Sequence, residues 1–477
     1  MGTKLLSRGV AVGVVVTVAA FSPQYAHAQQ PAEQPSPEGQ PPVAEPPPAS
    51  PDAPPAEPTT AEAQPEEPST PTSETTTSGE QPLPEPVPAE VEEDKPPPFR
   101  LDFYGFTMLD IGYQFKQNDP AWFDTLRPTK LPAFNNEFGE DGHTFASVRQ
   151  TRFGVKGFTP TDLGELQTIF EFEMFGVGAD AGQTTIRLRH AYGELGQIGA
   201  GQYWSPFMDI DVFPNSVEYW GPPGMAFFRN VQVRWMPIKG DTRLTFALER
   251  PGASADAADP YVERIELEGV QFRFPYPDAS GEFRYGAPWG YVELAGLLRR
   301  IEWDDPDTSD NDLSDGVFGW GFNLSSNVKL GGDNVLKLSA LYGEGIQNYM
   351  NDATADIGVE PNPGDAEQPL LGVAMPIVGL VAFVDWYWTE KWMSSAGYSM
   401  IWIDNASGQD PTDLEWGHYA LGNLFYKPVP DFMVGGEFQW GRRENWNDDF
   451  SVNDYRLQFS FKWSFAGTLA NTTEKAE

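Results

Sequence analysis

Basic residues recur at alternating positions in two neighbouring segments of the chain. The segment SVRQTRFGVKGF carries Arg152 and Lys156, and the segment TIRLRHAYGEL carries Arg187 and Arg189. A guanidinium group is planar and can hold a carboxylate through two parallel hydrogen bonds. Rings of arginine and lysine form anion-preferring constrictions in pores. The residue types and their spacing therefore favour a surface that binds small anions.

Further charged residues would face the same space if these segments are strands. The basic residues of the same parity are Arg234, Arg243, Arg284, Arg299 and Arg456. The acidic residues that could pair with them are Glu171, Glu173, Glu293 and Glu437. Asp209 and Asp211 lie on the long segment 205–224 that follows a strand, and a loop there could fold inward to narrow the pore. Two interpretations stay open at this point. The arginines line a selective constriction, or they pair with the acids and fill the interior.

Catalytic chemistry has little support in the sequence. Apart from the first 28 residues, the chain has only His143, His190 and His418, which are far apart and belong to no metal-binding motif. The chain contains no cysteine, which excludes thiolate zinc sites and cysteine nucleophiles. No phosphate-binding loop or nucleophile elbow is present. We expect no enzyme activity, no cofactor and no metal.

The elements that must position the charged residues are β-strands with two unlike faces. In DYRLQFSFKWSF, large apolar residues occupy every second position from Tyr455 to Phe465, with polar residues between them. The segment ELQTIFEFEMF places Phe170 and Phe172 on one face, and Glu171 and Glu173 on the other. A period of two residues is typical of a strand. Arg149 has the opposite parity to Arg152, unless a bulge intervenes.

The connections between these segments alternate between short turns and long polar loops. Short ones include TPTDLG, LGQIG and KPVPD, and long ones include 117–143, 304–315 and 351–368. Short turns at one end and long loops at the other are typical of outer-membrane barrels. We predict an all-β, antiparallel transmembrane barrel of about 16 strands, in which lipid solvates the apolar face and the polar face lines water.

The chain divides into four parts. Residues 1–28 have the charged, apolar and A-x-A regions of a signal peptide. Residues 29–98 are rich in proline and glutamate, and are expected to be a disordered periplasmic tether. Residues 99–465 form the predicted barrel, and 466–477 a polar tail. The formal charge of -38 makes nucleic-acid binding very unfavourable.

Several stretches resemble one known family, the DcaP-like outer-membrane porins. They are VRQTRFGVKGFTPTDLGELQTIFEFEMFG, RLRHAYGELGQIGAGQYWSPFMD, LAGLLR, NYMND and LFYKPVPDFMVGGEFQWGRREN. The resemblance implies a homotrimer of sixteen-stranded barrels in the outer membrane of a Gram-negative bacterium, each passing small anions such as dicarboxylates. It also implies that Arg152, Arg187, Arg189 and Arg234 line the pore.

We therefore expect a diffusion porin, embedded in outer-membrane lipid, with an arginine-lined constriction. The expected pore-lining residues are Arg152, Lys156, Arg187, Arg189, Arg234, Arg299, Arg456, Glu171, Asp209 and Asp211. A general or cation-preferring porin is the first alternative, favoured if Asp209, Asp211 and Glu171 dominate. A structural anchor that reaches peptidoglycan through residues 29–98 is the second.

Overall fold

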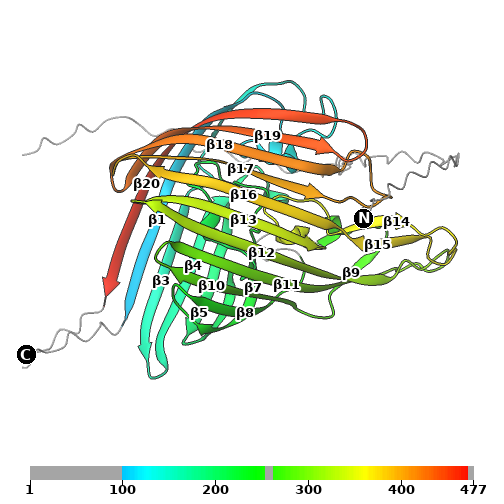
Figure 1. Cartoon of the computed structure of the whole chain (residues 1–477), viewed down its shortest axis with the longest axis horizontal. Coiled ribbons are helices and arrows are strands. Elements are labelled where there is room, and N and C mark those ends of the chain that lie inside the picture. The colour runs from blue at the N-terminus through cyan, green and yellow to red at the C-terminus, as the bar shows by residue number, and fades with distance from the viewer. Residues whose placement is uncertain (1–98, 253–260, 471–477) are drawn as a thin grey trace, which may run out of the picture. The chain divides into compact units, whose positions relative to one another are not determined.

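A computed structural model describes residues 99–252 and 261–470. These residues form a closed, 16-stranded antiparallel β-barrel, which confirms the predicted fold class (Figure 1). The expected signal peptide, the tether of residues 29–98 and the last seven residues of the tail lie outside the described residues. No helix in the described part of the chain is both long and apolar enough to cross a membrane.

The barrel strands are listed here with their bounds. They are β1 (Arg100–Gln114), β2 (His143–Ser147), β3 (Arg152–Thr161), β4 (Gly164–Phe175), β5 (Thr184–Leu195), β6 (Ile198–Trp204), β7 (Arg229–Ile238), β8 (Arg243–Glu249), β9 (Gln271–Arg273), β10 (Asp278–Ala287), β11 (Gly290–Asp304), β12 (Asp315–Gly331), β13 (Asn334–Glu344), β16 (Pro376–Tyr387), β17 (Trp392–Ile403), β18 (Leu414–Val429), β19 (Phe432–Asn445) and β20 (Ser451–Ala470). β2 and β3 both pair with β1 and together make one wall strand, as β9 and β10 do against β11.

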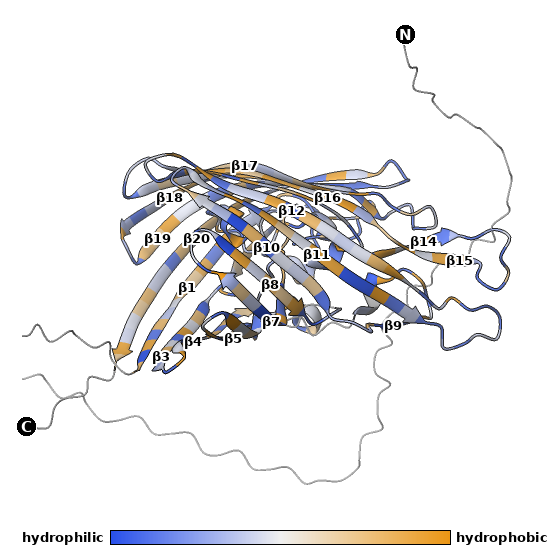
Figure 2. Cartoon of the chain, turned by 60° about the horizontal axis from the view of Figure 1, so that its bottom comes forward, coloured by the Kyte–Doolittle hydropathy of each residue, from blue (hydrophilic) through white to orange (hydrophobic). Residues whose placement is uncertain are grey.

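The alternation in the sequence separates a lipid face from a lumen face. In β4, Phe170 is 51% exposed on the outside, whereas Glu171 and Glu173 are buried inside the barrel. Figure 2 shows hydrophobic and hydrophilic residues alternating along the strands. In water, so many exposed apolar side chains would be unfavourable. In a bilayer they are solvated by lipid, and the closed barrel leaves no strand edge unpaired around its wall.

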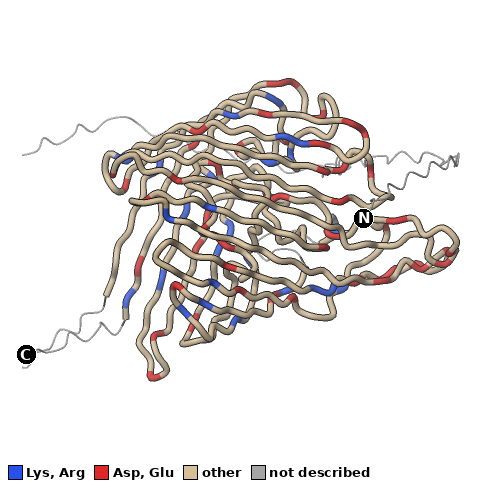
Figure 3. The backbone as a smooth tube through the Cα atoms, viewed as in Figure 1, with Lys and Arg blue, Asp and Glu red and all other residues tan. Residues whose placement is uncertain are grey.

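The connections at the two ends of the barrel differ as predicted. Turns of two to four residues, such as 162–163, 196–197 and 430–431, lie at the end where β1 begins and β20 finishes. Long loops join the strands at the other end, and Figure 3 shows many acidic residues on them. In barrels of this class the short turns face the periplasm and the long loops face the exterior.

The end of the barrel differs from the prediction. The sequence placed it at Phe465, but β20 continues to Ala470 and pairs with β1 as far as Arg100. Residues 466–470 are therefore strand and not tail. The physical reason is that β1 begins only at Arg100, so its backbone groups need partners up to that residue.

The long loops fold into the barrel. We call residues 115–142 L1, residues 205–228 L3 and residues 345–375 L6. Phe207 and Phe228 of L3 belong to the same buried cluster as Tyr349 of L6. Ile377 and Ile401 of the wall complete this cluster, and all five side chains are at most 3% exposed. Burial of this size anchors the loops against the inner wall.

Short elements shape these loops. The 3-10 helices are η1 (Pro120–Trp122), η2 (Pro128–Lys130), η3 (Gly178–Asp180), η4 (Ile210–Val212), η5 (Tyr261–Arg264) and η6 (Gln347–Tyr349). L6 also contains a two-stranded sheet of β14 (Ile357–Pro361) and β15 (Leu370–Ala374).

Candidate pore constriction

L3 enters the barrel and first binds the wall at β10–β12. The Asp209 carboxylate accepts hydrogen bonds from Arg284 Nη2 at 2.7 Å, from the Tyr291 hydroxyl at 2.7 Å and from the Ser325 hydroxyl at 2.6 Å. The carboxylate is buried, and it therefore needs this set of donors. Asp209 thus attaches L3 to the wall and does not face the pore.

L3 then follows the wall past β13 and β16. Lys337 Nζ donates to the Phe213 carbonyl at 2.5 Å, and the Asn215 amide donates to the Asp385 carboxylate at 3.1 Å. The Asn423 side chain of β18 donates to the Asn215 carbonyl at 2.7 Å. Phe213 therefore contacts β13, and Asn215, two residues later, contacts β16 and β18. This is the pattern expected of an extended segment that crosses the strands of the sheet.

The tip of L3 reaches β19 and β20. The Ser216 hydroxyl and the Val217 amide donate to the Glu437 carboxylate at 2.8 and 3.2 Å. Gln458 Nε2 of β20 and Gln150 Nε2 both donate to the Val217 carbonyl, at 2.8 and 2.7 Å. L3 has then followed the inner wall from β10 to β20.

Beyond its tip, L3 meets β4 and β5. The Tyr219 hydroxyl donates to Glu173, and Arg187 Nη1 donates to that hydroxyl at 3.3 Å. The Tyr219 ring stacks on Phe175 at 3.7 Å between centroids, with an interplanar angle of 6°. L3 therefore presents Tyr219 directly to the arginine-rich part of the wall.

Four arginines surround one glutamate in that part of the wall. Oxygens of Glu173 lie 3.0 Å from Arg152, 3.8 Å from Arg187, 2.8 Å from Arg189 and 3.9 Å from Arg229. We call these residues, with Glu171, the arginine cluster. It brings together Arg152, Arg187, Arg189 and Glu171 as the sequence predicted.

Glu171 is the second acid of the arginine cluster. It binds Arg189 Nε at 2.6 Å and accepts the Tyr104 hydroxyl at 2.7 Å. The cluster therefore contains four arginines and two glutamates. Arg152 is its most exposed arginine, with 25% of its side chain accessible, so it is the guanidinium of the cluster that the lumen reaches most easily.

A second group of charges, on β8, β10 and β11, has the opposite balance. Arg284 binds Asp211 and Glu293, both at 2.6 Å, as well as Asp209. Arg243 binds Glu282 at 3.0 Å and Glu293 at 2.9 Å. Four carboxylates here face two guanidinium groups. Asp211, whose side chain is 47% exposed, is the most accessible acid among them.

Three other arginines that were predicted to line the pore are buried, namely Arg234, Arg299 and Arg456. Arg234 donates to Gln232 at 2.7 Å and lies 5.1 Å from the Tyr203 ring. Arg299 binds Asp278 at 3.0 Å and Asp356 at 3.4 Å and has no exposed surface. The prediction that Arg299 lines the pore is therefore wrong, because L6 folds over it.

Arg456 is likewise a contact to a loop. Its guanidinium donates to the Phe123 and Thr125 carbonyls of L1 at 2.9 and 2.5 Å, and the residue is fully buried. The prediction that Arg456 lines the pore is also wrong, since L1 folds over it. Arg149 lies in the break between β2 and β3 and binds Asp124 of L1 at 2.6 Å. The break removes the parity conflict with Arg152.

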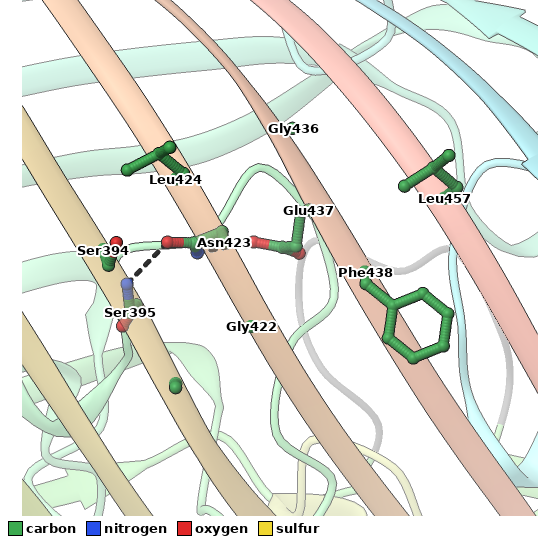
Figure 4. Close-up of a pocket in the computed structure, with 10 residues that line it drawn as sticks. Ser394, Ser395, Gly422, Asn423, Leu424, Gly436, Glu437, Phe438 and Leu457 are labelled. Atoms are coloured by element: carbon green, nitrogen blue, oxygen red, sulfur yellow. Dashed lines mark hydrogen bonds between the residues drawn. The ribbon is translucent and has the colours of Figure 1, made fainter.

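A shallow depression on the outer wall marks the place where the L3 tip is attached (Figure 4). The small residues Ser394, Gly422 and Gly436 line it, with Phe438 and Leu457 beside them. The backbone ladder between β17 and β18 is interrupted there, between the pairs Met393–Phe425 and Ala396–Gly422. The exposed apolar side chains around the depression belong to the lipid face, whereas Asn423 and Glu437, which also line it, bind the L3 tip.

Glu218 connects L3 to L1. Its carboxylate accepts the Leu126 amide of L1 at 3.1 Å and the Gly221 amide of L3, and the residue is 2% exposed. Burial raises the pKa of Glu218 to about 7, although the positive charge of Arg456 acts in the opposite direction. This raised pKa makes the free energy of unfolding depend on pH, by about 3 kcal/mol between low and high pH.

The Glu218 contact should weaken with rising pH. Its pKa is raised in the folded state, so its contribution is fully present below the ordinary glutamate pKa and is lost as the pH rises through about 7. Hydrogen exchange at Leu126 and Gly221, corrected for intrinsic rates, should show less protection at pH 8.5 than at pH 5.5. Glu218→Gln should remove this dependence, whereas Glu140→Gln, at an exposed position of L1, should leave it. Equal protection at both pH values would contradict the assignment.

Among the described residues, no group of three or more histidine, aspartate or glutamate side chains has an arrangement that could hold a metal ion.

The arginine cluster contains one residue that the sequence reasoning missed, Arg229. It lies at the entry to β7, with the opposite parity to Arg234, so alternation alone could not find it.

Comparisons with known proteins agree with this architecture. The family model described as "DcaP outer membrane protein" matches residues 93–458. The crystal structure of the outer membrane channel DcaP of Acinetobacter baumannii is 20% identical, with a TM-score of 0.62, over 76% of this chain and 97% of that chain. OmpT of Vibrio cholerae is 14% identical, with a TM-score of 0.48, over 79% of this chain and 100% of that chain.

An anion-selective porin from Comamonas acidovorans is 9% identical, with a TM-score of 0.48, over 76% of this chain and 99% of that chain. No curated protein sequence matches the chain. The family model covers most of the sequence. The chain therefore belongs to the DcaP outer membrane protein family and is an outer-membrane channel of a Gram-negative bacterium.

Proposed function

We propose that this protein is a diffusion porin that prefers small anionic solutes, dicarboxylates among them, and that it has no enzyme activity. The observation that carries the proposal is the arginine cluster, in which four guanidinium groups surround two buried glutamates opposite Tyr219 of L3. Guanidinium groups at a constriction raise the local concentration of anions and lower that of cations.

The geometry of the cluster supports carboxylates in particular. Arg152 has a partly accessible guanidinium. Guanidinium groups hold carboxylates through directional pairs of hydrogen bonds. A solute with two carboxylates can place them against basic side chains of the lumen and leave neither of its own charges unpaired.

The assembly and the N-terminal segment complete the proposal. The protein forms a homotrimer in outer-membrane lipid, the state that the resemblance to DcaP-like porins implies. Residues 1–28 are its signal peptide, and residues 29–98 are a periplasmic tether that reaches toward peptidoglycan. No nucleic acid takes part.

A cation-preferring pore is the second candidate, and a specific observation favours it. Asp211 is the most accessible acid of the group on β8, β10 and β11, where carboxylates outnumber arginines. If the permeating ions follow that side of the lumen, the acidic group sets the selectivity.

Reversal potentials of the purified full chain in planar bilayers distinguish the two candidates. Under a tenfold KCl gradient, the potential should move toward the Nernst value of chloride. A potential near the potassium value would overturn the proposal in favour of the second candidate. Complete absence of conductance would favour a structural anchor.

A further inference from the structure

Two lysines face the lumen below the attachment of the L3 tip. Lys462 in β20 has the same parity as Gln458, which binds the L3 tip, and lies between it and the periplasmic end of the strand. Lys156 in β3 has the parity of Arg152 and lies nearer the turn at 162–163. Going from the arginine cluster toward the periplasm, basic side chains therefore continue along this wall.

Both ammonium groups lie close to aromatic rings. Lys462 Nζ lies 4.0 Å from the centroid of the Phe106 ring, and Lys156 Nζ lies 5.2 Å from that of Tyr104. The Arg152 guanidinium lies 5.4 Å from the Phe106 ring. In the part of the chain that the structure describes, neither lysine has a hydrogen bond or an ion pair. An aromatic ring alone replaces only a small part of the hydration of an ammonium ion.

The carboxylates on this part of the wall already have other partners. Asp110 accepts Gln458 Nε2 at 3.1 Å and Gln150 Nε2 at 2.9 Å, and it also accepts the Ser460 hydroxyl. Asp102 pairs with Lys156 in the register of β1 and β3, but its carboxylate binds Arg100 at 3.3 Å and accepts the Thr468 hydroxyl at 2.9 Å. Both acids are therefore held by donors other than the two lysines.

The surface between the cations is apolar. Phe106 packs beside Met108, and Met433 and Phe425 belong to the same cluster below Val217 of L3. Phe106 itself is half-buried, so one part of its ring is accessible from the lumen. Cations around an apolar floor suit a small organic anion whose carbon atoms rest on the ring while its carboxylate meets the ammonium groups.

We propose that Lys462, Lys156 and Arg152 form an anion-binding site on the periplasmic side of L3. It takes the carboxylate group of a small organic acid as the solute leaves the arginine cluster, with Phe106 beneath the carbon chain. Because its ligand is the proposed anionic solute, the site rests on the proposed function. Its positive potential is a property of the wall and can be measured separately.

A single introduced thiol can report that potential, because the chain contains no cysteine. Ser464 has the parity of Lys462, is exposed and pairs with Phe106 in the barrel register. In Ser464→Cys, an anionic methanethiosulfonate should react faster than a cationic one. Adding Lys462→Met should lower the ratio of the two rates about fivefold, the effect expected for one unit charge removed nearby. Lys391→Met, in the turn of residues 388–391, is the matched control and should leave the ratio unchanged.

Block by a dicarboxylate tests the ligand. Glutarate added from the periplasmic side should block the wild-type channel, and the Lys156→Met, Lys462→Met double variant should weaken this block about tenfold. Lys391→Met should not change it. Suppose that the wild-type channel prefers potassium, but that Lys462→Met still lowers the ratio of anionic to cationic reaction rates at position 464. The proposed anion preference would then be wrong, and the positive site would stand. An unchanged thiol ratio in an anion-selective channel would overturn the site and retain the proposed function.

Discussion

Replacing Arg189 with alanine should shift the reversal potential of the channel strongly toward the potassium value. Arg189 is 4% exposed and binds Glu171 at 2.6 Å and Glu173 at 2.8 Å, so its charge neutralises the two acids directly. Without it, the arginine cluster loses one of its four positive charges, and Glu171 loses its nearest cation. We expect the ratio of chloride to potassium permeability to fall about tenfold, as for a unit charge removed at close range.

The control for Arg189→Ala removes the same charge elsewhere. Arg442 lies on the outer face of β19, where it binds Glu444 at 2.6 Å. Arg442→Ala should leave the permeability ratio at its wild-type value, since that side chain does not face the lumen. If both variants gave the same ratio, the arginine cluster would not be the selectivity site.

Replacing Glu173 with glutamine should cause the largest loss of stability. Glu173 has no exposed surface, and its carboxylate lies within 3.9 Å of four arginines. Removing one partner from a buried ion-pair network leaves the other charges without compensation, at a typical cost of about 3–5 kcal/mol. The mutual repulsion of the arginines adds to this cost, because they remain in the same confined space.

The measurement for Glu173→Gln is the temperature at which the folded band disappears in a heat-modifiability gel. We expect a clear decrease from the wild-type temperature. Glu165→Gln, at an exposed position of the same strand, removes an equal charge and should leave the temperature unchanged. A wild-type temperature for Glu173→Gln would show that the arginines do not need this counter-charge.

The wall of the barrel could be predicted from the sequence because a strand has a strict period of two residues. That period correctly placed Phe170 outside and Glu171 inside, and it brought Arg152 and Arg189 to the same wall. The period says nothing about loops. Arg299 has the right parity for the lumen, but L6 covers it and binds it through Asp356.

The limits of the barrel were less predictable for a related reason. The positions of β20 that face the lipid continue past Phe465 to Gly467 and Leu469. Small residues in this stretch make the alternation of apolar and polar side chains hard to recognise in the sequence. The ring of Phe465 lies over Gly105 of β1, where an added Cβ would be 2.6 Å from it. Only the register with β1 shows that both strands continue beyond this contact.

The path of L3 also determines the order in which the protein can fold. L3 precedes β8 in the chain, yet its partners include Asp385, Asn423, Glu437 and Gln458, which are synthesised much later. The loop cannot reach its final position until the last strand is in place. Contacts between distant parts of a chain form slowly, because the intervening loop must first be closed. Barrel closure and narrowing of the pore should therefore be a single, late kinetic step, and a chain that lacks β20 would have an L3 without the hydrogen bond from Gln458 at its tip.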